Sequence, residues 1–129
     1  MTQDSQAQEQ TQIQVENQTR GQTVVSDCEI ADSGWTRFKG LIGHEPLAQG
    51  EGMLINPCSS IHTHFMGFPI DVLFVDKEHR VVGITENLKP WRFGRIFRGV
   101  RYVIELPAGT VAATGCEAGD QLQILGYAM

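Results

Sequence analysis

Short apolar runs recur along residues 23–129 and are broken by turn residues, a pattern that predicts many short strands. Residues 71–76 contain four consecutive apolar side chains, which is typical of a strand buried on both faces. The polar turn at 76–80 separates them from residues 81–88, so these two strands are predicted to form a hairpin. Further strands are expected at residues 13–15, 23–30, 52–57, 61–65, 102–106 and 121–125.

Two short helices are predicted beside these strands. Asp32 or Ser33 offers an N-cap for the first, whose apolar side chains recur at helical spacing until Gly43 ends it. The second is expected around residues 110–114. Because helices and strands do not alternate, a doubly wound parallel sheet is disfavoured. The sequence therefore predicts an α+β fold, mostly β, with a strongly curved sheet or small barrel of six to seven short strands and two peripheral helices.

Glutamine dominates the beginning of the chain. Residues 1–22 hold eight glutamines and few large apolar side chains, so they bury too little surface to offset the entropy of ordering them. They are predicted to form a largely disordered tail. Residues 23–129 contain no visible repeat or linker, and they are expected to fold as a single compact domain.

Composition narrows the class of protein. The 129 residues carry a net charge of −5, which disfavours a broad nucleic-acid-binding surface. No apolar stretch approaches the ~20 residues that a membrane-spanning helix needs, so no membrane partner is expected. Cys28, Cys58 and Cys116 lie far apart and form no disulfide framework. Reduced thiols in a cytoplasmic protein are the simplest expectation.

The densest group of candidate functional side chains lies between residues 58 and 66. It consists of Cys58, His62, His64 and Met66. In an extended chain His62, His64 and Met66 would share one face. Thiolate, imidazole and thioether groups bind zinc or copper, and Asp71 or Cys116 could complete such a site. The spacing matches no standard zinc motif and the histidines could equally line a polar pocket, so we predict neither a metal nor a cofactor.

Cys58 also permits a second hypothesis, a nucleophilic thiol with His62 as its base. This chemistry requires a lowered cysteine pKa, a turn at residues 57–60 and a carboxylate such as Asp71 or Glu105 to orient the imidazole. Plain packing is the alternative, since free cysteines are often buried. Strand alternation points Glu105 away from its two apolar neighbours, towards either a pocket or water.

Five of the ten basic residues lie within residues 89–101, without an acid between them. Trp91 and Arg92 combine an aromatic ring with a planar cation, a pair suited to an anionic ligand, a nucleic-acid strand or an acidic partner. The alternative is a solvated basic loop whose aromatic side chains turn into the core.

Seven ordered motifs cover most of the predicted domain. They are Phe38-Lys-Gly-Leu-Ile-Gly43, Gly50-Glu-Gly-Met-Leu54, Cys58-x-x-Ile-His-Thr63, Met66-x-Phe-Pro-Ile-Asp71, Leu88-Lys-Pro-Trp-Arg92, Glu105-Leu-Pro-Ala-Gly109 and Gly119-Asp120. Over residues 23–126 the chain thus resembles domain-of-unknown-function family number 192, specifically its soluble branch with a Cys-x-x-Ile-His-Thr segment. The resemblance implies a compact, mostly β domain with flanking helices, but no reaction. His64 departs from the family pattern, which weakens a metal site that needs it.

The leading hypothesis is a non-catalytic binding or interaction module. Its pocket would hold a small ligand, anionic ligands included, or a segment of a protein partner. The residues predicted to line the pocket are Cys58, His62, Met66, Asp71, Trp91, Arg92 and Glu105. The first alternative is a metal- or thiol-dependent enzyme that uses Cys58 and His62. Nucleic-acid binding through residues 89–101 is the third hypothesis, which the net charge disfavours.

Overall fold

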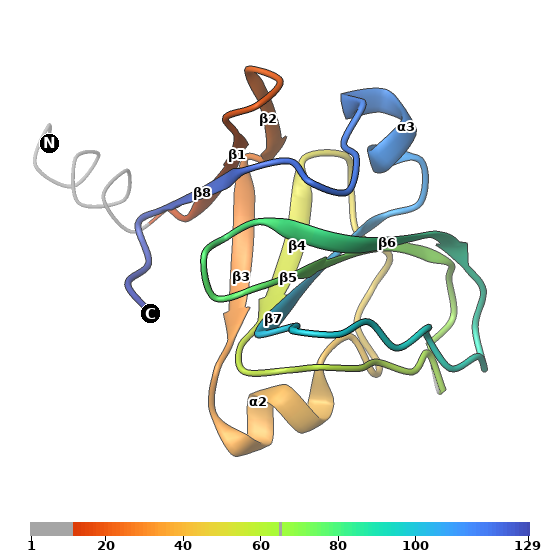
Figure 1. Cartoon of the computed structure of the whole chain (residues 1–129). Coiled ribbons are helices and arrows are strands. Elements are labelled where there is room, and N and C mark those ends of the chain that lie inside the picture. Colours follow the sequence, from red (N-terminus) through yellow and green to blue (C-terminus); the bar gives the residue numbers. More distant parts are fainter. Residues whose placement is uncertain (1–11, 65) are drawn as a thin grey trace, which may run out of the picture.

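The computed structural model describes residues 12–64 and 66–129, and these form eight strands and two short helices (Figure 1). The elements in chain order are β1 (Gln14–Asn17), β2 (Gln22–Val25), β3 (Asp27–Ala31), α2 (Gly34–Lys39), β4 (Glu51–Ile55), β5 (Ile70–Val75), β6 (Val81–Leu88), β7 (Tyr102–Pro107), α3 (Thr110–Thr114) and β8 (Leu122–Leu125). β1 lies within residues 1–22 and is ordered because its Val15 is buried in the core. The disorder expected of residues 1–11 lies outside the described residues.

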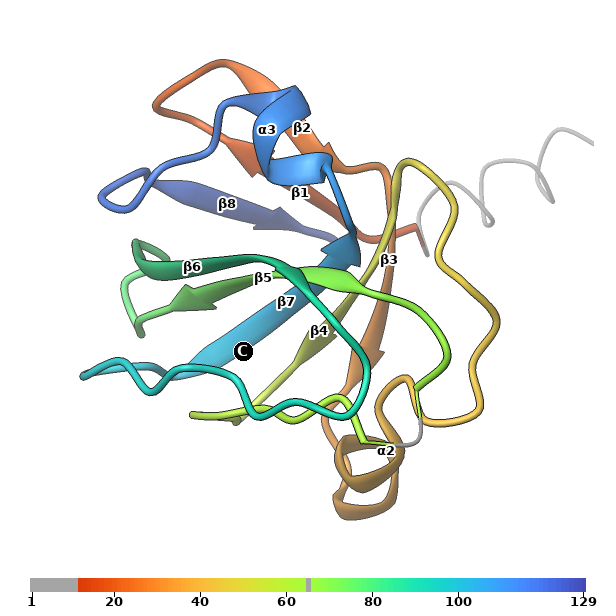
Figure 2. The same ribbon diagram turned by 90° about the vertical axis from the view of Figure 1, so that its right-hand side faces the viewer.

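The strands form two sheets that lie one above the other (Figure 2). The smaller sheet has the order β2-β1-β8, and the larger has the order β3-β4-β7-β5-β6. All pairs are antiparallel except β3 with β4. The predicted mostly-β α+β class is confirmed, as is the β5–β6 hairpin. The described strands number eight rather than six or seven, and they do not close into a barrel.

One extra strand arises because the strand predicted at residues 23–30 is divided in two. The chain leaves the smaller sheet after β2 and enters the larger sheet at β3. Ser26 occupies the break, and the N–H groups of Ser26 and Asp27 both donate to the Gly50 carbonyl. Apolar spacing alone does not reveal this change of sheet, because both halves bury apolar side chains.

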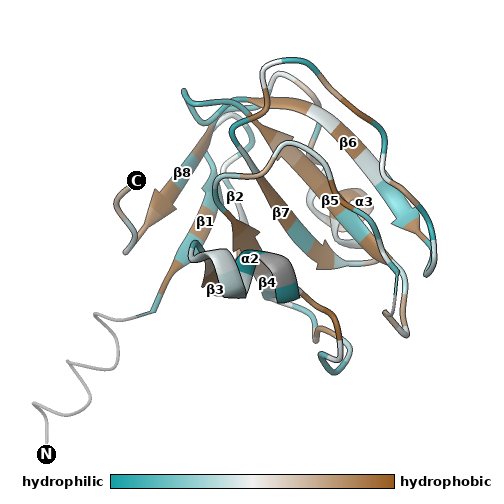
Figure 3. Ribbon diagram, turned by 90° about the horizontal axis from the view of Figure 1, so that it is seen from below, coloured by the Kyte–Doolittle hydropathy of each residue, from teal (hydrophilic) through white to brown (hydrophobic). Residues whose placement is uncertain are grey.

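Two apolar clusters lie on opposite faces of the larger sheet. The first fills the space between the two sheets and includes Leu54, Leu73, Ile104 and Leu106. The second lies on the other face, where Met53, Val72 and Val103 pack against the segments that follow α2 and β4. Every residue of β5 is buried, as its continuous apolar run predicts, and Figure 3 shows this hydrophobic centre in brown.

Both helices begin where the sequence predicts. Ser33 caps α2, since its Oγ accepts a hydrogen bond from the Thr36 N–H and its own N–H donates to Thr36 Oγ1. α2 ends at Gly40 rather than at Gly43, because Gly40 adopts a positive φ of 48° that stops the helix. α3 occupies Thr110–Thr114 as expected. Neither helix in the described residues has the length and apolar character needed to cross a membrane.

Candidate functional site

One carboxyl group points into the second apolar cluster. Glu105 of β7 lies between Met53 of β4 and Val72 of β5 in the register of the larger sheet. Its neighbours Ile104 and Leu106 belong to the first cluster, so Glu105 faces the opposite side, as strand alternation predicts. The residue is 3% exposed, and its Oε1 atom has no hydrogen-bond partner among the described residues.

Burial controls the charge of this group. Removal of Glu105 from water raises the pKa of its carboxyl group to about 8, because the protein interior disfavours the ionised form. At neutral pH the carboxyl group is therefore mostly protonated and can donate an O–H hydrogen bond. A protonated carboxylic acid can donate this hydrogen bond to an acceptor atom of a ligand, in place of a water molecule.

A cavity of about 210 Å³ lies beside Glu105, between the larger sheet, α2 and the segment that follows β4. Its polar lining consists of Arg37, Lys39, Cys58, Ser60, His62 and Glu105. Its apolar lining consists of Leu41, Ile42, Ile55, Ile61 and Met66. We call this space the Glu105 cavity. Four of the seven residues predicted from the sequence to line a pocket, Cys58, His62, Met66 and Glu105, thus come together here.

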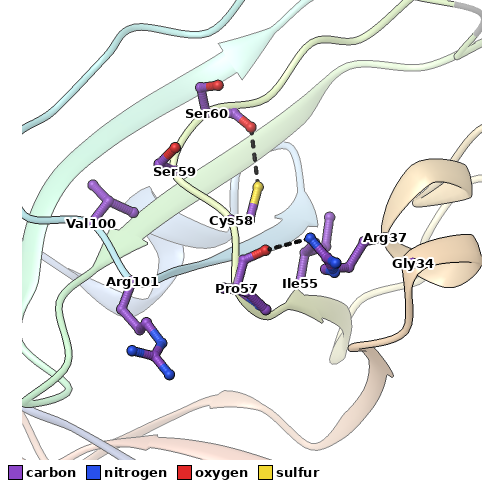
Figure 4. A pocket seen from close by; sticks show the side chains of 9 residues that line it. All are labelled: Gly34, Arg37, Ile55, Pro57, Cys58, Ser59, Ser60, Val100 and Arg101. Atoms are coloured by element: carbon purple, nitrogen blue, oxygen red, sulfur yellow. Dashed lines mark hydrogen bonds between the residues drawn. The ribbon is translucent and has the colours of Figure 1, made fainter.

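An open cleft of about 770 Å³ adjoins the Glu105 cavity (Figure 4). The two spaces share Arg37, Ile55, Cys58 and Ser60, so these side chains lie between them. Arg37 Nη1 donates to the Pro57 carbonyl at 3.4 Å, and Cys58 Sγ donates to the Ser60 carbonyl at 3.1 Å. These two hydrogen bonds attach α2 and the Cys58 side chain to the same short segment.

The Cys58 thiol is held in its protonated form. Burial raises its pKa and is the largest effect, and the nearby Glu105 carboxyl group adds to it, while the Ser60 backbone and Arg37 oppose it. A nucleophilic cysteine needs the reverse shift, because the thiolate is the attacking species. The chain bends at Asn56, Pro57 and Ser59, and the hydrogen bond that Cys58 Sγ makes in this segment goes to the Ser60 carbonyl.

The predicted alignment of His62, His64 and Met66 on one face is found only in part. The rings of His62 and His64 lie 5.1 Å apart, and His62 and Met66 both line the Glu105 cavity, but Met66 is buried in the second apolar cluster whereas His62 is exposed. The reason is that residues 61–64 form a single bridge, between His62 and Phe93, instead of a strand. Within residues 12–64 and 66–129, no three His, Cys, Asp or Glu side chains are grouped closely enough to hold a metal ion.

Asp71 lies on the other face of the larger sheet, away from the Glu105 cavity. Its register partner on β7 is Leu106, which belongs to the first apolar cluster. Asp71 Oδ1 accepts a hydrogen bond from the Asn87 N–H at 2.8 Å. Its Oδ2 accepts from the N–H groups of Gly109 and Val111 at 3.1 and 2.9 Å. The carboxylate thereby joins β5 and β6 to the first turn of α3.

Trp91 and Arg92 lie beside the Glu105 cavity but do not line it. Thr63 holds this segment in place: its carbonyl accepts from the Trp91 N–H, and its Oγ1 accepts from the Arg92 N–H. Trp91 and Phe93 do not turn into the core, since they are 53% and 77% exposed, whereas Phe97 packs against Phe74 of the second apolar cluster. His62 contacts Phe93 and also lines the cavity, so the exposed rings border the cavity at His62.

Sequence reasoning missed two cations of the cavity, Arg37 and Lys39. Both lie in the last turn of α2, a position where basic residues commonly complement the helix dipole. Basic residues at these two positions are therefore expected from helix stability alone, and the sequence does not mark them as functional. β3 and β4 pair in parallel, so the end of β3, from which α2 continues, lies beside the end of β4. This places Arg37 and Lys39 at the cavity that Glu105 lines.

Comparison with known proteins places the chain in a family. The DUF192 family model, described as "Uncharacterized ACR", matches residues 14–124. A UPF0127 protein of Pyrococcus furiosus is 36% identical over 112 residues, which cover 83% of this chain and 94% of that protein. A UPF0127 protein of Thermococcus sibiricus is 34% identical over 111 residues, with coverage of 82% and 71%.

Two solved structures have a similar fold. A protein of unknown function from Novosphingobium aromaticivorans matches with a TM-score of 0.75 and 24% identity, covering 86% of this chain and 82% of that one. A Sinorhizobium meliloti protein described as a "putative transcription regulator" matches with a TM-score of 0.72 and 28% identity, covering 89% and 93%. The resemblance predicted from the seven motifs is confirmed: the chain belongs to the uncharacterised DUF192 family, whose relatives carry the name UPF0127.

Proposed function

We propose that this protein is a small binding module that holds a small ligand in the Glu105 cavity. The observation that carries the proposal is the state of Glu105, a buried carboxyl group that lines a cavity and has an oxygen without a hydrogen-bond partner in the described part of the chain. Burial of an unpaired polar group costs stability, so such groups are uncommon unless something else requires them. A ligand that forms a hydrogen bond with Glu105 would explain why the chain keeps a buried polar group that lowers its stability.

The dimensions and the lining support a small ligand. The volume of about 210 Å³ is below the range of roughly 300–1,000 Å³ that accommodates drug-sized molecules. Apolar side chains line much of the wall and a few polar groups converge on it, which is the usual composition of a ligand site. The cytoplasmic location expected from the sequence remains part of this proposal, since all three cysteines are free thiols, which suit a reducing compartment.

A fragment screen by NMR tests the proposal. Small fragments should shift the backbone amide signals of Ile61, His62 and Glu105, because these residues line the cavity. Signals from α3, on the other side of the larger sheet, should stay unchanged. The Glu105→Leu variant should lose the response, since it removes the polar group that we expect to orient the ligand.

The outcome that contradicts the proposal is equally specific. A diverse fragment set that leaves the cavity signals unchanged would remove the binding function. Shifts that persist unaltered in Glu105→Leu would move the ligand away from Glu105 and would contradict the role given to this residue.

A further inference from the structure

The charges around the Glu105 cavity indicate which class of ligand it takes, an inference that rests on the proposed binding function. The titratable groups that line the cavity together with Glu105 are Arg37 and Lys39 of α2, both of which are exposed, and Cys58 and His62 of the segment after β4. The adjacent strands contribute only Met53 and Val72 at the paired positions. Glu105 is thus the single acid among the residues that line the cavity.

We propose that the Glu105 cavity binds a small aliphatic monocarboxylate, whose carboxylate accepts a hydrogen bond from the Glu105 carboxyl group and is neutralised by Arg37 and Lys39. One carboxylate can use both kinds of partner, because the acid and the two cations line the same small space. The aliphatic chain would pack against Leu41, Ile61 and Met66, which supply the apolar wall. Charge-assisted hydrogen bonds of this type are the strong ones in proteins.

Ligands of other charge fit the lining less well. An ammonium ligand would need Glu105 to be ionised, and it would be repelled by the two cations of α2. A neutral amide could pair with Glu105, but it would gain no charge attraction from the two cations at the edge of the cavity. The cavity volume limits the ligand to a few heavy atoms in either case.

Glu105 makes this binding dependent on pH in a defined direction. The carboxylate of the ligand is ionised throughout pH 6–9, since ordinary carboxyl groups titrate near pH 4. Glu105 donates its hydrogen bond only while it is protonated, and burial raises its pKa to about 8. Affinity should therefore be nearly constant below pH 7 and should fall by about tenfold between pH 7 and pH 9.

Calorimetric titration with butyrate, butyramide and n-butylammonium tests the ligand class, because these probes have similar size and differ in charge. Butyrate should bind most tightly of the three at pH 7, and its affinity should fall about tenfold at pH 9.

Glu105→Gln should remove the pH dependence, since an amide does not titrate in this range. Arg37→Ala and Lys39→Ala should each weaken butyrate several-fold. Lys77→Ala, in an exposed turn between β5 and β6, is the matched control and should leave the affinity unchanged.

The possible failures are distinguishable. Tighter binding of butylammonium or butyramide than of butyrate would overturn the carboxylate class and leave the binding module in place. The same holds if other fragments shift the cavity signals while butyrate does not. Butyrate binding that is independent of pH in the wild-type protein would overturn the role of Glu105, whether or not the variants fold.

Discussion

Asp71 and Glu105 are buried carboxyl groups on the adjacent strands β5 and β7, and the structure surrounds them in different ways. Asp71 is 0% exposed and accepts three hydrogen bonds from backbone N–H groups. Glu105 is 3% exposed, faces the opposite side of the sheet and lines a cavity, and its Oε1 atom has no hydrogen-bond partner within residues 12–64 and 66–129. Asp71 therefore stabilises the fold through its hydrogen bonds, whereas Glu105 is the carboxyl group that we propose pairs with a ligand.

Comparison of Asp71 with Glu105 indicates that burial alone does not identify a carboxyl group that binds a ligand. Both were predicted from the sequence as pocket residues, and both turned out to be buried. Their hydrogen-bond partners distinguish them. A carboxylate whose oxygens already accept hydrogen bonds gains little from a ligand, whereas a carboxyl group with an unpaired oxygen gains a hydrogen bond.

The largest expected effect concerns Asp71. Asp71→Ala leaves three backbone N–H groups without their acceptor, of which the Val111 N–H is in a fully buried bond. The free energy of unfolding should fall by about 3–5 kcal/mol, since each lost buried partner costs about 1–3 kcal/mol. Urea denaturation followed by circular dichroism measures this value, and Asp71→Asn, which keeps one acceptor oxygen, should lose less. A loss below about 1 kcal/mol would show that the backbone groups find other partners.

Glu105 should behave in the opposite way. Glu105→Leu replaces the unpaired buried acid by an apolar side chain of similar size, so the free energy of unfolding at pH 8 should rise by up to about 4 kcal/mol. The unfolded chain releases the Glu105 proton near its ordinary pKa of 4.5, whereas the folded protein retains it up to a pKa of about 8. Glu105 therefore lowers the stability of the wild-type protein progressively as pH rises between these values, with a limiting slope of about 1.4 kcal/mol per pH unit.

Urea titrations of both proteins at pH 5 and pH 8 measure this contribution. The advantage of Glu105→Leu should be larger at pH 8 than at pH 5. An equal difference at the two pH values would mean that Glu105 titrates normally in the folded protein, and the contrast with Asp71 would then disappear.

The smallest expected effect concerns Cys58, which adjoins Glu105 in the cavity. Because burial and the Glu105 carboxyl group raise the pKa of the thiol, Cys58 should react with iodoacetamide several-fold more slowly than glutathione at pH 8. Mass-spectrometric peptide mapping resolves Cys58 from the two other cysteines, and Glu105→Leu should speed its reaction modestly. A rate above that of glutathione would instead favour the thiol-dependent enzyme considered from the sequence.

Much of the local structure was predictable from the sequence. The strands at residues 71–76, 81–88 and 102–106 were placed to within a residue or two, because their apolar runs and flanking turns are local signals. The Ser33 cap was predictable for the same reason. The segment predicted as a strand at residues 61–65 was not: its pattern alternates as in a strand, but the hydrogen bonds of its described residues 61–64 go largely to a loop, residues 89–94.

The sequence by itself determined the family, the order of the elements and the fact that Glu105 points away from Ile104 and Leu106, because motif order, apolar periodicity and strand alternation are properties of the chain itself. Only the tertiary structure decided that Arg37 and Lys39 line the same cavity as Glu105, that Asp71 faces away, and that Met66 is buried while His62 remains exposed. These arrangements depend on which strands pair and which face each segment covers. Such contacts join residues far apart in the chain, so their energies come from packing and hydrogen bonding that no local pattern specifies.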